Sequence, residues 1–217
     1  MKIKIKILTI LAIICFAQSA YAERPLNEIP MYGGQHDPKV SENKEVSKGA
    51  VELGWKYYDK GDYDTAIKRF NQAWMFDRNS PEVFWGFGVI MGVRATSENP
   101  EKNLNESIKF LEKASEVLNN NPRLMIDLAY SETILGAFLR GNQKEGSQNH
   151  FNKARNLFKR SEKLETGNSL LYSNWAVLEF FEENYIEAKE KLAIAKKLGF
   201  KPNPDFENDL KAKLKNN

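Results

Sequence analysis

The sequence predicts an all-α protein made of repeated helix pairs, and three observations support this prediction. Apolar residues recur at spacings of three and four from about residue 48 onward, which is the helical period, and no segment alternates like a strand. One pattern of small and apolar residues occurs four times. Short breaks rich in Gly, Pro, Asn and Ser separate its copies. With 217 residues, 41% of them hydrophobic and 28% charged, the chain can form one domain with a sizeable core.

Residues 1–22 are typical of a secretory signal peptide. Three lysines precede an apolar stretch from Ile7 to Ala17, and Ala20-Tyr21-Ala22 forms a small-x-small cleavage site. The apolar stretch is shorter than the roughly 20 residues of a membrane-spanning helix, so an uncleaved anchor is the less favoured alternative. We therefore expect cleavage after Ala22 and a periplasmic or secreted protein of a Gram-negative type bacterium.

The mature chain is expected to have neither cysteine nor net charge. The one cysteine, Cys15, lies in the signal, and bulky Ile14 precedes it where a lipoprotein signal needs a small residue. Lipidation, disulfides and thiolate metal sites are therefore not expected. Removal of Lys2, Lys4 and Lys6 reduces the net charge from +3 to zero, with 29 basic and 29 acidic residues. We accordingly expect neither nucleic-acid binding nor stable membrane insertion after cleavage.

Residues 23–47 are expected to form an extended leader. The segment contains three prolines and the pair Gly33-Gly34, and it has no sustained helical or strand period. Within it, residues 29–34 form a compact apolar segment. This segment either packs on the first helices as a strap or binds a partner.

The repeat region is expected to span residues 48–200. In the first and fourth copies, a small residue is followed 12, 16 and 19 positions later by small or apolar residues: Gly54, Ala66, Phe70, Ala73 and Ala176, Ala188, Leu192, Ala195. The middle copies keep the second part of the pattern, at Ser107, Leu111, Ala114 and at Ala154, Phe158, Ser161. Their first small residues, Gly88 and Ala129, lie 19 and 25 positions earlier. These copies therefore contain polar insertions, near Pro100 and Gly141, that lengthen the turns or the helix ends.

The breaks divide the region into four copies and a tail. The expected copies are 48–80, 81–121, 122–168 and 169–200, and a C-terminal capping helix and tail follow at 201–217. Each copy is expected to be an antiparallel helix pair that touches at small residues, as at Gly54 and Ala66. Gly61 is expected to end the first helix.

These residues resemble the signature of the tetratricopeptide repeat family. Copy one contains Leu53-Gly54-x-x-Tyr57, Gly61-Asp62-Tyr63-Asp64-x-Ala66, Phe70 and Ala73, and copy four contains Asn184-Tyr185-Ile186-Glu187-Ala188 at the matching place. The resemblance covers about Ser47 to Phe200. It implies a right-handed solenoid of about four helix-turn-helix repeats that binds other proteins.

The same resemblance implies that the first helix of each repeat lines a concave face. The residues that it places there are Val51, Trp55, Tyr58, Trp85, Val89, Ile126, Tyr130, Val177 and Phe180. As a set they suggest an aromatic-lined groove for a peptide or a partner helix, and the alternative is that they are core residues. The family's clamp of Lys, Arg and Asn for a terminal carboxylate is not matched, because Trp55 occupies the place of the asparagine.

The sequence contains no legible catalytic motif, and we expect no catalytic residue, cofactor or metal site. His36 and His150 are far apart, and Gly86-Phe87-Gly88 lies in a helical pattern instead of following a strand. We predict an exported scaffold without enzymatic activity that binds a protein or peptide. The alternatives are a structural component of an envelope or secretion complex, a small-ligand or glycan binder, and an enzyme whose site spans the insertions near His150.

The signal-peptide prediction is tested by N-terminal sequencing of the exported protein. We expect the mature chain to begin at Glu23 without a lipid, because the small-x-small site ends at Ala22. A chain that begins at a modified Cys15 would contradict both the cleavage site and the absence of cysteine.

Overall fold

The structure is a computed structural model that describes residues 40–96, 99–141 and 144–216. The predicted signal peptide and the leader up to residue 39 lie outside the described residues. The described residues form nine α-helices and no strand. These helices are α2 (Lys44–Tyr58), α3 (Tyr63–Phe76), α4 (Pro81–Arg94), α5 (Pro100–Ser115), α6 (Pro122–Leu139), α7 (Lys144–Leu164), α8 (Ser169–Phe181), α9 (Tyr185–Lys197) and α10 (Pro204–Asn216).

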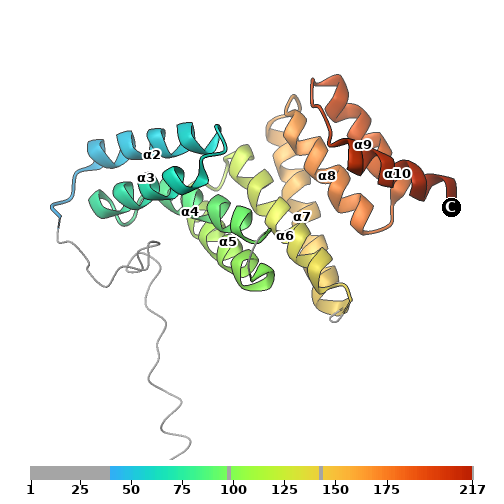
Figure 1. The fold of residues 1–217 in the computed structure, drawn as a ribbon, viewed down its shortest axis with the longest axis horizontal. Coiled ribbons are helices and arrows are strands. Elements are labelled where there is room, and N and C mark those ends of the chain that lie inside the picture. Colours follow the sequence, from blue (N-terminus) through green and yellow to red (C-terminus); the bar gives the residue numbers. More distant parts are fainter. Residues whose placement is uncertain (1–39, 97–98, 142–143, 217) are drawn as a thin grey trace, which may run out of the picture.

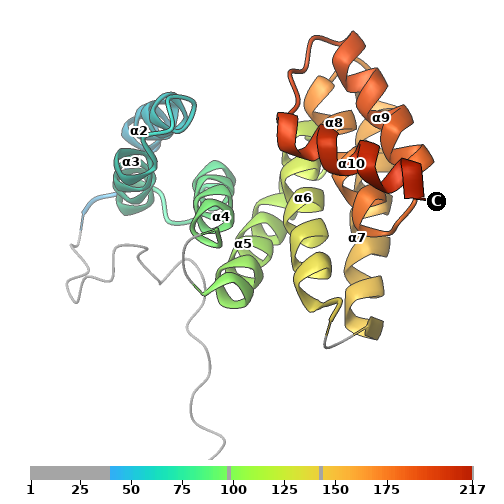
Figure 2. The same cartoon turned by 45° about the vertical axis from the view of Figure 1, so that its right-hand side comes forward.

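The helices pack as consecutive pairs. α2 packs chiefly on α3, α4 on α5, α6 on α7 and α8 on α9, and α10 packs on α9. Figures 1 and 2 show the pairs following one another along the molecule, from α2 and α3 at one end to α9 and α10 at the other. This arrangement confirms the predicted all-α solenoid of helix pairs.

The helix ends follow from local sequence signals. Five helices begin at a residue whose side chain accepts a hydrogen bond from a backbone N–H of the first turn: Asn43, Asp62, Ser80, Asn121 and Asn168. Gly61 and Gly199 have φ values of +76° and +91°, a left-handed conformation that glycine adopts without steric cost. The turns that connect the helices in the first repeat and before α10 therefore depend on glycine.

The insertions lengthen helices as well as turns. In the third pair, α6 has 18 residues and α7 has 21, against 15 and 14 for α2 and α3. In the second pair the extra residues also lie mainly in the facing helix ends, because the turn before Pro100 spans residues 95–99 and is only one residue longer than the turn at 59–62 in the first pair. Asn99, the last residue of this turn, has a φ of +40°. The helix pairs therefore differ in length while they keep the same order of packing.

One phenylalanine ring joins the first two pairs. Phe70 of α3 is fully buried. A Cβ atom on Gly54 of α2 or on Gly86 of α4 would lie 2.5 Å from an atom of this ring. Both helices therefore approach α3 where they have no side chain, and Phe70 fills the space between them.

Buried serines lie at several helix contacts. Ser47, Ser107, Ser147 and Ser161 each donate a hydrogen bond through Oγ to a backbone carbonyl of the neighbouring helix, at 2.7–3.1 Å. A buried hydroxyl without a partner would cost free energy, so these bonds make a serine acceptable where the helices touch. The serines that depart from the repeat pattern are thus accommodated by hydrogen bonding across the interface.

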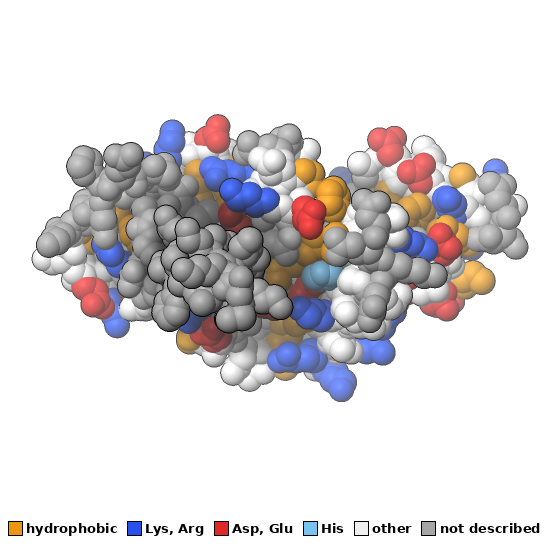
Figure 3. All heavy atoms as spheres, turned by 90° about the horizontal axis from the view of Figure 1, so that it is seen from below, with side chains coloured by type: hydrophobic (Ala, Val, Ile, Leu, Met, Phe, Trp, Pro, Cys, Tyr) orange, Lys and Arg blue, Asp and Glu red, His pale blue; other side chains and the backbone are white. Residues whose placement is uncertain are grey.

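The surface has mixed charge. On the face seen from below, acidic and basic side chains both lie around hydrophobic ones, and no single sign of charge covers the described part of that face (Figure 3). This view agrees with the equal numbers of acidic and basic residues expected after signal cleavage.

Substitution of Gly86 tests the packing of α4 on the Phe70 ring. We expect Gly86→Ala to lower the free energy of unfolding by about 1–3 kcal/mol, because its Cβ would overlap the buried ring of Phe70. Gly49→Ala in α2 is the matched control, since a Cβ there meets no atom within 4 Å. The control should raise the free energy of unfolding by up to about 1 kcal/mol through helix propensity. Urea denaturation measures the free energy of unfolding of both variants. A Gly86→Ala variant as stable as the original protein would contradict the close contact of Gly86 with Phe70.

Candidate functional site

Five of the predicted residues gather around two neighbouring cavities, and all five belong to the first three repeats. Trp55 and Tyr58 come from α2, Trp85 and Val89 from α4, and Tyr130 from α6. Trp55, Tyr58 and Trp85 are half-buried, Val89 is buried, and Tyr130 has 40% of its surface exposed. The structure therefore brings five of the nine predicted side chains to one region.

The aromatic side chains of this region contact one another edge to face. The ring centroids of Trp55 and Trp85 are 4.9 Å apart, and those of Trp55 and Tyr58 are 5.6 Å apart. Trp55 also packs on buried Phe70, at 5.3 Å. Each ring is thus fixed by a neighbour and offers its remaining surface to solvent.

The larger cavity is lined by residues of five helices, α2 to α6. It has a volume of about 510 Å³. Aromatic and aliphatic side chains predominate in its lining: Tyr58, Tyr63, Val89, Val93, Leu104, Tyr130, Ile134 and Phe138 are among them. Phe138 is 49% exposed, which is unusual for a side chain of its size. We call this cavity, together with the Trp55 and Trp85 rings, the aromatic groove.

One carboxylate lies in the aromatic groove. Asp127 of α6 is half-buried and lines the larger cavity. Its Oδ2 accepts a hydrogen bond of 2.7 Å from Nε1 of Trp85. Burial raises the pKa of Asp127 to about 6, against the opposing effects of the Trp85 hydrogen bond and the positive charge of Arg123.

A smaller cavity adjoins the two tryptophans. It has a volume of about 300 Å³ and is lined by Trp55, Asp59, Trp85 and Arg123. Trp85 connects the two cavities, because its ring lines the smaller one and its Nε1 donates to Asp127 in the larger one.

The other four predicted residues do not reach the groove. Val51 and Ile126 are buried among core residues, because the helices of neighbouring repeats pack over them. Phe180 lies against Phe206 of the capping helix α10, with ring centroids 5.4 Å apart, and Val177 is half-buried on α8. The groove therefore occupies the first three repeats and does not extend along the whole array.

Two groups of charged residues connect α6, α7 and α8. Glu132 is only 1% exposed, and its carboxylate contacts Nδ1 of His150 and lies 3.3 Å from Nζ of Lys153. Glu179 accepts hydrogen bonds from Arg155, Trp175 and Asn184, and Arg155 also pairs with Glu182: these contacts join α7 to α8. His150 lines neither cavity of the groove.

In the second of these groups, the hydrogen bonds favour the ionised form of Glu179. Burial alone would raise the pKa of Glu179, but the hydrogen bonds from Arg155, Asn184 and Trp175 outweigh it and lower the pKa. The same carboxylates raise the pKa of Arg155 in spite of its burial. These groups are therefore satisfied ion pairs at helix contacts.

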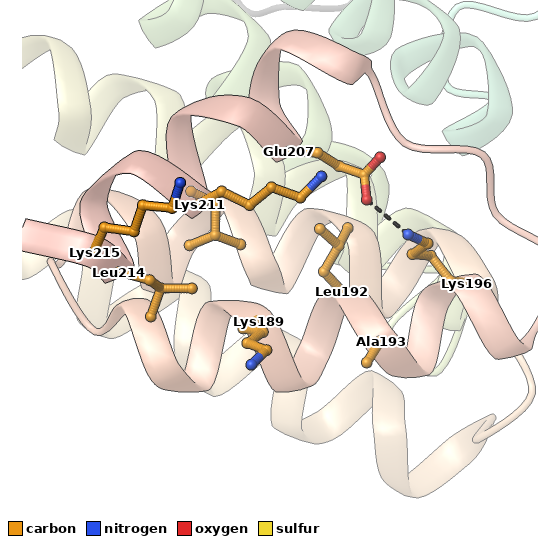
Figure 4. Close-up of a pocket in the computed structure, with 9 residues that line it drawn as sticks. Lys189, Leu192, Ala193, Lys196, Glu207, Lys211, Leu214 and Lys215 are labelled. Carbon is orange, nitrogen blue, oxygen red and sulfur yellow. Dashed lines mark hydrogen bonds and ion pairs between the residues drawn. The ribbon is translucent and has the colours of Figure 1, made fainter.

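A further groove lies between α9 and α10, with a volume of about 350 Å³. Figure 4 shows Leu192 of α9 and Leu214 of α10 at its floor and lysines along its edges. One of these lysines, Lys196, pairs with Glu207 of α10 at 2.7 Å. None of the nine predicted residues lines this groove.

Neither a metal cluster nor a membrane span is found in the described part of the chain. The residues at 40–96, 99–141 and 144–216 contain no group of three or more His, Cys, Asp or Glu side chains placed to hold a metal ion. None of the helices in these same ranges is both long enough and apolar enough to cross a bilayer.

Sequence reasoning missed Asp127, Tyr63, Ile134 and Phe138. Asp127 had a detectable signal, because it is an acidic residue within an otherwise apolar stretch of α6. Such a residue is usually buried with a partner or faces a site. The other three lie outside the helix positions that the family resemblance assigns to the concave face, so only the packing of several helices places them in the groove.

Comparisons with known proteins agree with the fold. A family model described as a TPR repeat matches residues 54–92. A solved structure of a thermophilic TPR protein from Thermus thermophilus superposes with a TM-score of 0.60 at 15% identity, over 70% of this chain and 74% of that one. PilF of Pseudomonas aeruginosa gives a TM-score of 0.35 at 16% identity, over 73% and 78%. No curated protein sequence matched the chain.

The matched segment contains most of the first helix pair and α4, the elements that Phe70 joins. A TPR repeat model thus matches this part of the chain, and the Thermus TPR protein shares the fold of consecutive helix pairs.

Proposed function

We propose that the protein is an exported scaffold that binds a segment of another protein in the aromatic groove. Binding of another protein is the expectation for a tetratricopeptide repeat protein. The location of the binding surface on α2, α4 and α6 is the more specific claim.

One observation above all others supports a binding surface on α2, α4 and α6. Large aromatic side chains from three different helices border the two cavities, and they remain partly exposed: Tyr130 and Phe138 have 40% and 49% of their surface accessible. Rigid aromatic residues contribute a large contact area at a low entropic cost, and they predominate among the residues that carry binding energy at interfaces. Other exposed apolar residues, such as Val117, Leu164 and Ile186, are dispersed over α7, α9 and the turn after α5. Isolated apolar residues of this kind are ordinary on protein surfaces.

The location of the protein outside the cytoplasm rests on the sequence of residues 1–22. A signal of this composition directs a protein across the inner membrane, and the chain that remains contains no cysteine. A periplasmic or secreted partner is therefore part of the proposal.

A second function has one observation in its favour. The volume of the larger cavity, about 510 Å³, lies within the range of sites for small molecules. A small apolar ligand or a glycan would use the same aromatic surface, so the assay must separate it from a protein. Crosslinking in living cells, followed by mass spectrometry, does so because it detects captured proteins.

We expect the double substitution Tyr130→Ser and Phe138→Ser to reduce the capture of the groove's protein partner at least tenfold, which corresponds to about 1.4 kcal/mol. Both side chains are only half-buried, so the melting temperature should change less than the capture does. Leu164→Ser is the matched control, because Leu164 is also half-exposed but lies on α7 outside the groove. Equal amounts of every crosslinked protein in the double variant and in the control would contradict the proposal.

A further inference from the structure

No positive charge among the described residues contacts Asp127. The Trp85 indole is the one hydrogen-bond donor that the described residues direct at its carboxylate. Arg123, one helical turn earlier on α6, affects its pKa only at longer range and lines the smaller cavity. An acidic group that has lost part of its hydration is unfavourable unless an opposite charge or a proton compensates it.

The surroundings of Asp127 fit a cation on an apolar stem. The hydroxyl-bearing rings of Tyr58, Tyr63 and Tyr130 line the same cavity, and the faces of aromatic rings attract cations. Aliphatic residues such as Leu104 and Ile134 also line it and can contact methylene groups. The cavity thus combines a carboxylate, aromatic rings and apolar walls.

We infer that the partner segment inserts a lysine or arginine side chain into the larger cavity, with its charge against Asp127 and its methylenes against the apolar wall. This inference rests on the proposed function, because it names the chemistry of the segment that the groove binds. A neutral apolar side chain and a free amine are the competing occupants, and the experiment separates them.

The test uses two peptides and one amine as probes of the full mature protein. The peptides are acetyl-Ala-Ala-Lys-Ala-Ala-amide and its norleucine counterpart, which has a similar chain length and no charge; the amine is n-butylammonium. The indole N–H resonance of Trp85 reports binding, because this group donates to Asp127. We expect a saturable shift with the lysine peptide and at least tenfold weaker binding of the norleucine peptide and of the free amine.

The matched variants are Asp127→Asn and Asp59→Asn. Asparagine at position 127 keeps an oxygen acceptor for Trp85 but removes the charge, so the lysine peptide should bind at least tenfold more weakly. Asp59 lines the smaller cavity, and its substitution should leave the affinity unchanged. Equal binding of the lysine and norleucine peptides, no loss in Asp127→Asn, tighter or equal binding of free butylammonium, or no shift with any probe would each overturn the inference.

Failure of this inference and failure of the proposed function give different results. If Tyr130→Ser with Phe138→Ser abolishes protein capture while the lysine peptide shows no preference, the groove binds a neutral segment. If the lysine peptide binds at Asp127 but the double variant captures its proteins as before, the cation site exists and the groove is not the protein-binding surface.

Acidification should weaken the binding of the lysine peptide. The carboxylate attracts a cation only when ionised, and with a pKa of about 6 most of it is protonated at about pH 5. Burial raises the pKa values of Tyr58, to about 12, and of Tyr130, so these two hydroxyl groups keep their protons in this range. Arg123 acts on Asp127 as a nearby positive charge. Tyr63 lines the cavity as well, and Asp59, which faces the smaller cavity, is controlled by its own variant. An affinity that is equal at about pH 7.5 and pH 5 would contradict the role of Asp127.

The free protein should show the opposite pH dependence in its stability. The pKa of Asp127 is raised to about 6 on folding, so between about pH 6 and pH 4 the folded state binds a proton that the unfolded state does not. Relative to Asp127→Asn, the free energy of unfolding should therefore increase as the pH falls through this range. Urea denaturation at several pH values measures the difference, and a constant difference between the two proteins would contradict the raised pKa.

Discussion

The arrangement of the first two repeats depends on the contact of one aromatic ring with two glycines. Phe70 is fully buried, and a Cβ on Gly54 or on Gly86 would lie 2.5 Å from it. α2 and α4 therefore approach α3 only where they lack side chains, and this contact determines the separation of the first two repeats. The same separation brings Trp55 and Trp85 to a centroid distance of 4.9 Å. The aromatic surface of the groove is thus a consequence of how the core packs.

The C-terminal repeats are joined by different chemistry. Three positions after the first small residue of each repeat, the first two repeats have Tyr57 and Met91, and the last two have Glu132 and Glu179. Both glutamates are buried and contact basic or polar side chains, most of them from neighbouring elements: His150, Lys153, Arg155, Asn184 and, from the same helix as Glu179, Trp175. Removal of one member of a buried pair leaves an uncompensated charge, so these contacts specify how α6, α7 and α8 pack. The groove lies where the helix contacts are aromatic, and the ion pairs occupy the contacts beyond it.

The helix pairs were predictable from sequence because they depend on local properties. Helical period, capping residues and the spacing of small residues all act within one pair, and residues such as Gly61 and Phe70 have the roles that their positions imply. The groove depends on the packing of five helices, α2 to α6. Val51 and Ile126 have the expected helix positions but are covered by neighbouring repeats, and Phe180 is covered by α10. Asp127 faces the cavity from a position that a single repeat pattern does not assign.

Contacts within the protein hold the aromatic side chains of the groove in place, and this has two consequences for the proposed binding. Trp55 is fixed by Phe70 and Trp85 by Asp127, so a partner segment would immobilise few side chains on binding and retain more of its interaction energy as affinity. The same frame keeps the carboxylate of Asp127 half-buried with no contacting cation among the described residues, which is unfavourable for an ionised group. In the proposed complex, the positive charge of the partner segment would remove this cost. The group that lowers the stability of the fold would then be the one that selects the partner, as is common where stability and function compete at a site.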